Sequence, residues 1–302
     1  MSWQSRLINP ALRLIEKPQL ARAKNPRALR RSFEFKARIL FRPPRQVSVV
    51  DWLDDPGLDV MPRGASPDRT ILYFHGGGYI FGSPRSHAGL AGQIAVRTGA
   101  RVILPDYPLA PEHPFPAAFD HALQAYETLL QRVGSPEHIQ IGGDSAGGGL
   151  ALALNAWLAK ENGPVPAGCF AFSPLTDLTY SGPSVTENAK IEAYLPAARV
   201  WDMARLYLNG ADPTDPRASP LFAAFADAAP VWLTVGKTEI LRDDSLRIAE
   251  RIRSDGTSID LLVEEDLPHV WPIFFSYLPE ARSTLDALGQ WITQHWQSPT
   301  ES

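Results

Sequence analysis

From about residue 46 the chain alternates short apolar segments with longer segments whose apolar residues recur every three or four positions. Short apolar runs are typical of buried strands, and the longer spacing is typical of helices. Strands that are joined through helices run parallel, and the helices then cover both faces of the sheet. The sequence therefore predicts an α/β fold with a mostly parallel central sheet and helices on both faces.

The alternation gives approximate bounds for each element. Strands are predicted at Val47–Leu53, Thr70–Phe74, Ala100–Pro105, His138–Ile141, Ala167–Phe172, Val231–Val235 and Ile259–Val263. Helices are predicted at Ser86–Thr98, Ala117–Val133, Gly147–Lys160, Ser245–Arg253 and Ala281–Trp296. The last strand in the sequence is expected at a sheet edge, where it offers a surface for a homodimer.

Two segments interrupt the alternation. Residues 1–45 have a helical pattern and no strand partner, and residues 178–218 insert a helix at Ala197–Leu208 among turn residues. Insertions in such folds usually lie over the carboxyl ends of the strands, where ligands bind. We expect the two segments to form one cap over an α/β domain that comprises residues 46–177 and 219–302.

The charge is distributed unevenly along the chain. Residues 1–50 hold twelve Lys or Arg against two acidic residues, a net charge of +10, and the rest of the chain carries −14. Such a basic segment suits nucleic acid or an anionic membrane, but the sequence pI of about 6.0 argues against a nucleic-acid binder. We expect a solvated amphipathic helical segment.

The cysteine count and the apolar runs exclude several protein classes. A single cysteine, Cys169, permits no intrachain disulfide and no multi-cysteine metal site. No run of apolar residues approaches the length of a membrane span, and the first twenty residues lack the apolar core of a signal peptide. We expect a cytoplasmic protein with no stable membrane insertion and no metal, and a membrane-surface role of the basic N-terminal segment stays open.

The strongest chemical signal is the G-x-S-x-G motif at Gly143–Gly147, which follows a predicted strand and precedes a predicted helix. Small residues flank Ser145 because a sharp strand-to-helix turn holds a nucleophile in a strained conformation. Glycine-rich turns also hold phosphates and dinucleotides. This one lacks the lysine of a P-loop and the spacing of a dinucleotide fingerprint. Ser145 is the predicted nucleophile.

A second glycine-rich motif, His75-Gly76-Gly77-Gly78, follows the strand predicted at Thr70–Phe74. Attack on a carbonyl places negative charge on its oxygen, and each fixed N–H group aimed at that oxygen stabilises the transition state by roughly 3–4 kcal/mol. Glycines let the backbone approach the substrate. We expect the N–H groups of Gly77, Gly78 and Ala146 to form the oxyanion hole, and His75 to hold the loop by hydrogen bonding.

A nucleophilic serine needs a base, and the sequence offers seven histidines. His269 follows the last predicted strand, where a base reaches a serine at the strand ends. It is therefore the predicted general base. The other histidines besides His75 are expected to be structural or solvated: His87, His113, His121, His138 and His295.

The base in turn needs a carboxylate that orients it. Glu239 lies just past the strand at Val231–Val235 and is the preferred acid. Asp243 stays open as an alternative, although capping of the helix that follows also explains it. Asp266 is close to His269 in sequence, but a loop acid there is as easily solvated.

These motifs resemble the bacterial carboxylesterases related to hormone-sensitive lipase, which have the α/β-hydrolase fold. The matching stretches are residues 75–78, 106–118, 143–148, 239–243 and 268–269. Many members have Asp-Pro-Leu-x-Asp where this chain has Glu-Ile-Leu-Arg-Asp. The match puts Glu239 at the position of the acid, and the departure keeps Asp243 open. The resemblance also implies that residues 1–45 and about 178–215 form the cap.

The resemblance and the motifs together predict a serine carboxylesterase that acts on short to medium acyl esters through an acyl-enzyme, with no cofactor. The alternatives are a lactone hydrolase or a deacetylase with the same machinery, and a hydrolase-fold protein that binds ligand without turnover. Tyr194, Leu195 and Trp201 of the cap are expected to line the substrate pocket.

Overall fold

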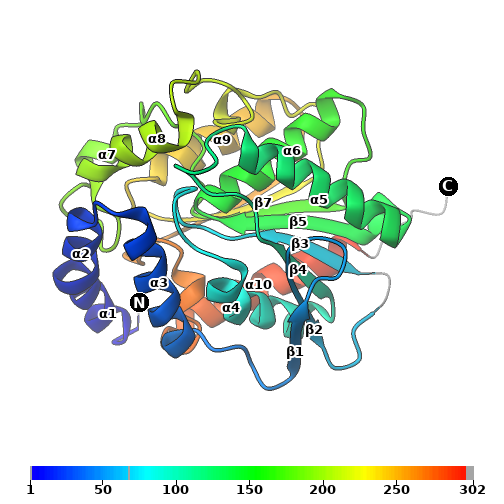
Figure 1. The fold of residues 1–302 in the computed structure, drawn as a ribbon, viewed down its shortest axis with the longest axis horizontal. Coiled ribbons are helices and arrows are strands. Elements are labelled where there is room, and N and C mark those ends of the chain that lie inside the picture. The colour runs from blue at the N-terminus through cyan, green and yellow to red at the C-terminus, as the bar shows by residue number, and fades with distance from the viewer. Residues whose placement is uncertain (1, 67–68, 297–302) are drawn as a thin grey trace.

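A computed structural model describes residues 2–66 and 69–296. Eight strands form one sheet in this part of the chain, in the order β1-β2-β4-β3-β5-β6-β7-β8 (Figure 1). The strands are β1 Val47–Asp51, β2 Gly57–Pro62, β3 Thr70–Phe74, β4 Arg101–Pro105, β5 Ile139–Asp144, β6 Gly168–Phe172, β7 Val231–Gly236 and β8 Ile259–Glu264. From β4 to β8 all neighbours pair parallel, whereas β1 and β2 pair antiparallel with each other and β2 with β4. The predicted mostly parallel sheet is confirmed.

Helices cover both faces of the sheet, as predicted (Figure 1). The main helices of this layer structure are α4 Pro84–Thr98, α5 Ala117–Val133, α6 Ala146–Lys160, α9 Arg242–Ser254 and α10 Pro279–His295. Alternate strand residues point to opposite faces. Leu72 and Phe74 of β3 pack in the core with α5, α6 and α9, and Ile71 and Tyr73 pack in the core with α4 and α10. Because the strands from β4 to β8 pair parallel, their carboxyl ends meet at one edge of the sheet.

Two groups of helices lie outside these layers. The N-terminal group consists of α1 Ser5–Ala11, a π-helical turn at Leu12–Glu16, α2 Lys17–Arg22 and α3 Pro26–Leu40. The inserted group consists of α7 Ser184–Glu187, a 3₁₀ turn at Ala197–Arg199 and α8 Val200–Leu208. Figure 1 shows the two groups together at one side of the sheet.

Hydrogen bonds join the two groups. The Arg13 guanidinium donates to the carbonyl oxygen of Ile191, with Nη2 at 2.6 Å. Lys17 Nζ donates to the carbonyl oxygens of Ala189 and Glu192, both at 2.8 Å. In each case a charged side chain of the N-terminal helices donates to a backbone carbonyl oxygen of the loop that precedes α8. These hydrogen bonds therefore hold the N-terminal helices against that loop.

Most predicted bounds are accurate to a few residues, and the prediction missed β2. Its sequence Gly-Leu-Asp-Val-Met-Pro contains residue types that strands usually lack. Pairing with β1 and β4 overrides that preference, and the buried Asp59 accepts hydrogen bonds from Arg101 of β4, with Nε at 2.8 Å. The ranges Thr70–Phe74 and Ala117–Val133 are found as predicted.

Two further predictions need correction or completion. The helix that was predicted to start at Ser245 starts at Arg242, so Asp243 and Asp244 lie in its first turn rather than before it. The last strand, β8, does lie at the sheet edge.

Among the residues described, none of the helices combines the length and apolar character that crossing a membrane requires.

Candidate functional site

Ser145 lies at the sharp turn between β5 and α6. Its backbone has φ 53° and ψ −122°, a conformation that L-residues rarely adopt. The turn is tight enough that a Cβ at Gly147 would overlap the carbonyl oxygens of Phe74 and His75. Two N–H groups, of Gly149 and Leu175, donate to the Ser145 carbonyl oxygen at 3.0 Å. The motif thus holds the serine at the carboxyl end of β5.

Three of the predicted site residues form one chain of hydrogen bonds. His269 Nε2 lies 2.9 Å from Ser145 Oγ, and His269 Nδ1 lies 2.7 Å from Glu239 Oε2. Glu239 follows β7 and His269 follows β8, so adjacent strands bring them together. All three groups project at the carboxyl edge of the sheet.

Glu239 is fully buried, and its second oxygen also has partners. Oε1 accepts hydrogen bonds from Ser173 Oγ at 2.8 Å and from the Gly236 N–H at 2.6 Å. Ser173 Oγ accepts in turn from the N–H of Val270, next to His269, at 3.2 Å. Sequence reasoning missed Ser173. Its position directly after β6, at the same edge as the other groups, was the available signal.

The environment of His269 changes the acidity of its ring. Burial by itself lowers the pKa of a histidine, but the hydrogen bond that the ring donates to Glu239 and the negative charges of Glu239, Glu192 and Asp144 outweigh it and raise the pKa of His269. Glu192, in the loop before α8, was also missed by sequence reasoning. Burial, with a further contribution from Glu239, raises the pKa of the Glu192 carboxyl.

The alternative acid, Asp243, points elsewhere. Its carboxylate lies 2.8 Å from Arg242 Nε and accepts a hydrogen bond from the Ser184 N–H at 2.8 Å. Asp266 lies 3.4 Å from Thr238 Oγ1. Neither carboxylate contacts His269 in the described part of the chain.

The glycine loop Gly76–Gly78 lies beside Ser145. Gly76 donates its N–H to Asp144 Oδ1 at 3.0 Å, which joins this loop to the serine turn. The N–H groups of Gly77 and Gly78 have no acceptor among the described residues. Ala146 is the first residue of α6, so its N–H has no partner within the helix. The three predicted donors are therefore free to bind an external oxygen.

His75 packs inside the loop that it begins. Its Nδ1 lies 2.8 Å from the Gly76 carbonyl oxygen, and its ring stacks on Tyr107 with centroids 4.3 Å apart. Burial, with the neighbouring His87, lowers the pKa of His75 to about 3. A neutral ring follows, which suits a structural contact. Tyr107, in the segment 106–118 that the sequence singled out, donates its hydroxyl to the His75 carbonyl oxygen at 2.6 Å.

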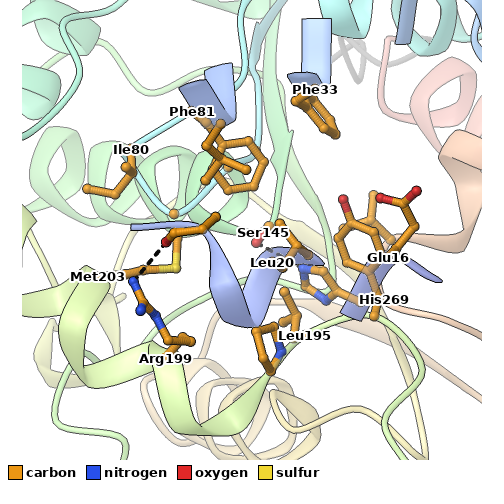
Figure 2. A pocket seen from close by; sticks show the side chains of 18 of the residues that line it. Glu16, Leu20, Phe33, Ile80, Phe81, Ser145, Leu195, Arg199, Met203 and His269 are labelled. Carbon is orange, nitrogen blue, oxygen red and sulfur yellow. Dashed lines mark hydrogen bonds between the residues drawn. The ribbon is translucent and has the colours of Figure 1, made fainter. Parts of the chain in front are cut away.

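The serine and the glycine loop open into a cavity of about 290 Å³. Figure 2 shows Ser145 and His269 in this cavity, with Leu20, Leu195 and Met203 around them. Its wall combines the two helical groups with the glycine loop and is mostly apolar. The Arg199 guanidinium donates to the Ala23 carbonyl oxygen at 3.0 Å and so closes the wall between the groups.

Comparisons with known proteins place this chain in a family. A family model described as alpha/beta hydrolase fold matches residues 71–273. The acetyl-hydrolase of Streptomyces hygroscopicus is 37% identical over 224 residues, which cover 74% of this chain and 75% of that protein. The esterase of Acinetobacter venetianus is 36% identical over 230 residues, which cover 76% of each.

A solved structure agrees over nearly the whole length. The crystal structure of an esterase from the bacterial hormone-sensitive lipase family matches with a TM-score of 0.92 and 34% identity, covering 98% of this chain and 99% of that one. The chain belongs to this hormone-sensitive-lipase-like family of the α/β-hydrolase fold. The resemblance that the motifs indicated is thereby confirmed.

In this family member, two of the three predicted pocket residues line the cavity. Tyr194 and Leu195 do so, and the Tyr194 ring stacks on that of His269 with centroids 6.4 Å apart. The prediction for Trp201 was wrong. Trp201 is 44% exposed and packs edge-on against Tyr180, because α8 turns the side chains of Met203 and its neighbours inward instead.

Sequence reasoning did not assign most of the residues that form the wall of the cavity. Leu20 and Phe33 come from the N-terminal helices, and Ile80 and Phe81 follow the glycine loop. Their helical or loop spacing is that of ordinary core residues, so no local signal marked them. Among the residues described, no group of three His, Cys, Asp or Glu side chains is arranged to hold a metal ion.

Proposed function

We propose that this chain hydrolyses short to medium acyl esters through a covalent acyl-enzyme. As a member of its family it is a carboxylic ester hydrolase. The observation that carries the finer proposal is the hydrogen-bond chain from Ser145 through His269 to Glu239, which opens into an apolar cavity beside free N–H groups.

The chemistry follows from this arrangement. Ser145 Oγ attacks the ester carbonyl, and its proton passes to His269 Nε2. The carbonyl oxygen becomes negative and accepts hydrogen bonds from the N–H groups of Gly77, Gly78 and Ala146. When the C–O bond to the alcohol breaks, His269 gives its proton to the departing oxygen. Water, deprotonated by the same imidazole, then attacks the carbonyl of the acyl-enzyme. The bond from that carbonyl to Ser145 Oγ breaks, and His269 returns the proton to Oγ, which releases the acid and restores Ser145.

Glu239 holds His269 with Nε2 toward the serine and stabilises the imidazolium that forms in each step. Its other oxygen is fixed by Ser173 and Gly236, so the carboxylate has little freedom to turn away. In this proposal Asp243 has no part in the reaction, because it is bonded to Arg242 and Ser184.

The cavity supports the proposed substrate size. Its volume of about 290 Å³ lies just below the roughly 300–1,000 Å³ range of small-molecule pockets. Residues 1–45 and 178–218 act together as the cap in this proposal, because both segments line the cavity. The name of the Streptomyces hygroscopicus relative, an acetyl-hydrolase, favours acetyl esters among short substrates.

The test compares Ser145→Ala with the unchanged protein on p-nitrophenyl butyrate. The variant is expected to lose turnover while its circular dichroism is unchanged. A fluorophosphonate probe should label the unchanged protein and leave Ser145→Ala unlabelled, which also separates an enzyme from a binding protein without turnover. Retained turnover in the variant would refute the nucleophile. A rate maximum at acyl chains of twelve carbons or longer would refute the size preference.

A further inference from the structure

Exposed apolar side chains gather on the N-terminal helices. Leu14 is 78% exposed and Phe35 is 66% exposed. The other large apolar residues exposed on these helices, or just before them, are Trp3, Leu7, Ile15, Ile39 and Leu40. Single exposed apolar residues are ordinary, but a group of them beside a cavity marks an interaction surface. We call Trp3, Leu7, Leu14, Phe35 and Ile39, with the exposed basic residues of the same helices, the cap face.

The cap face borders the mouth of the cavity. Ile15 directly follows Leu14, and Leu40 directly follows Ile39. Ile15 and Leu40 both line the cavity, and both are also exposed. They therefore form part of its rim, one from the π-helical turn and one from the end of α3. A surface that binds the cap face around Leu14 and Ile39 therefore lies next to the entrance that leads to Ser145.

The cap face is also cationic. The segment 2–45 contains only two acidic residues, and both are engaged: Glu16 accepts hydrogen bonds from Lys36, and Glu34 accepts one from the Ser83 hydroxyl. Seven exposed basic residues of the segment have no carboxylate partner in the described chain: Arg6, Arg22, Arg31 and Arg38 on the helices, and Lys24, Arg42 and Arg45 in the loops beside them. Their charge is available to an anionic partner.

Helix α3 brings the two properties together. Arg31, Phe35, Arg38 and Ile39 are exposed and spaced by four, three and one residues, so they share one side of the helix. Cations and apolar side chains on one exposed helix face are typical of segments that lie on a lipid surface. A second copy of the chain fits less well, since a symmetric contact would bring like charges together.

We propose that the cap face docks on an anionic lipid surface and thereby places the cavity mouth against it. The apolar side chains enter the headgroup region, and the arginines contact lipid phosphates. Docking depends on the cap face alone. Its consequence, that ester substrates pass from the lipid into the cavity, rests on the proposed function.

The test is co-sedimentation of the full chain with vesicles of phosphatidylcholine and phosphatidylglycerol, compared with phosphatidylcholine alone. The unchanged protein should sediment with the anionic vesicles at low salt and be released at high salt, because salt screens surface charges. Each cation near an anionic surface strengthens binding about fivefold, so Arg31→Gln with Arg38→Gln should weaken binding roughly 25-fold. Leu14→Gln with Phe35→Gln should also weaken it, by about tenfold.

Matched controls lie on the catalytic body. Lys160→Gln with Arg253→Gln removes two exposed cations that lie outside the cap face. Leu53→Gln replaces an 87% exposed leucine. Leu53 precedes Asp54, which pairs with Arg132 of α5, so this loop belongs to the α/β layers and not to the cap face. These variants should bind vesicles as the unchanged protein does. Equal weakening in control and cap-face variants would overturn the proposal, as would failure of the unchanged protein to bind anionic vesicles at low salt.

Two further readouts separate the alternatives. Sedimentation velocity without lipid should show no self-association that depends on Leu14 and Phe35. If the unchanged protein forms a dimer and Leu14→Gln with Phe35→Gln dissociates it, the cap face binds a second copy and the proposal is overturned. Turnover of dissolved p-nitrophenyl acetate should be unchanged in all cap-face variants. Ser145→Ala should bind vesicles normally, so a failure of catalysis is distinguished from a failure of docking.

Discussion

The ring of Tyr207, on helix α8, stacks on the ring of Tyr79, with centroids 3.9 Å apart and planes 8° from parallel. Tyr79 directly follows Gly78 and has φ 61°, so the stack supports the glycine loop at a strained position. One helical turn earlier on α8, the Met203 side chain lies over Gly78. The inserted helix therefore packs directly on the backbone that we propose binds the oxyanion.

Replacing Tyr207 tests this support. Tyr207→Ala removes the stacked ring and should lower kcat by about tenfold, since a loosened loop presents its N–H groups less precisely, and should lower the unfolding free energy by about 3 kcal/mol. Tyr207→Phe is the matched control. The Tyr207 hydroxyl is buried without a hydrogen-bond partner among the described residues, so its loss should leave kcat and stability nearly unchanged. Equal kcat in the Ala and Phe variants would contradict a positioning role.

A side chain at Gly78 should impair the glycine loop, chiefly through its backbone conformation. A Cβ there would overlap the terminal methyl of Met203, and φ 61° costs a non-glycine residue about 1–2 kcal/mol. Gly78→Ala should lower kcat/KM by at least about tenfold. Gly78→Ala with Met203→Ala should recover little of that loss, because the flexible end of Met203 can move aside in the single variant and the backbone strain persists in both. Steady-state kinetics of both variants and of Met203→Ala check this; full activity of Gly78→Ala would refute it.

The two candidate acids should behave differently. Glu239→Gln leaves His269 without its charged partner and should lower kcat by roughly 100- to 10,000-fold. Asp243→Asn should keep kcat within about threefold, because its bonds run to Arg242 and Ser184 rather than to the imidazole. Kinetics on p-nitrophenyl butyrate, with circular dichroism to check folding, measure both. An inactive Asp243→Asn beside an active Glu239→Gln would show that the acid is assigned wrongly.

The buried Glu192 should influence the pH dependence. Its carboxylate accepts hydrogen bonds from the N–H groups of Tyr194 at 2.8 Å and Ile240 at 3.0 Å, and its charge raises the pKa of His269. His269 acts as a base only when it is neutral, so kcat/KM rises as the pH passes upward through that pKa. Glu192→Gln removes negative charge, lowers the pKa of His269, and should move this acidic limb to lower pH.

A matched substitution is available for the Glu192 experiment. Glu187→Gln changes an exposed glutamate in the same inserted segment, where Glu187 pairs with Arg242 at 3.3 Å. Its pH–rate profile should coincide with that of the unchanged protein. A Glu192→Gln profile with the limb unmoved, or moved to higher pH, would contradict the influence of Glu192 on His269.

The parts that sequence determined are those that depend on local backbone chemistry. Apolar periodicity located the strands and helices, and the glycines around Ser145 and after His75 marked the two turns that approach a substrate. The sequence also indicated that Ser145, Glu239 and His269 come together, because each follows a predicted strand and parallel strands bring their carboxyl ends to one edge. These inferences require residue types and spacing, and no knowledge of distant contacts.

Tertiary packing decided the rest. Glu239 and Asp243 are four residues apart, and only the direction of each side chain at the end of β7 and the start of α9 separates their partners. Trp201 and Met203 are two residues apart on α8, yet one faces outward and the other covers Gly78. Ser173, Glu192 and Tyr207 acquire their contacts from segments far away in the chain. Their placement depends on how whole elements pack, which a local pattern of residues does not encode.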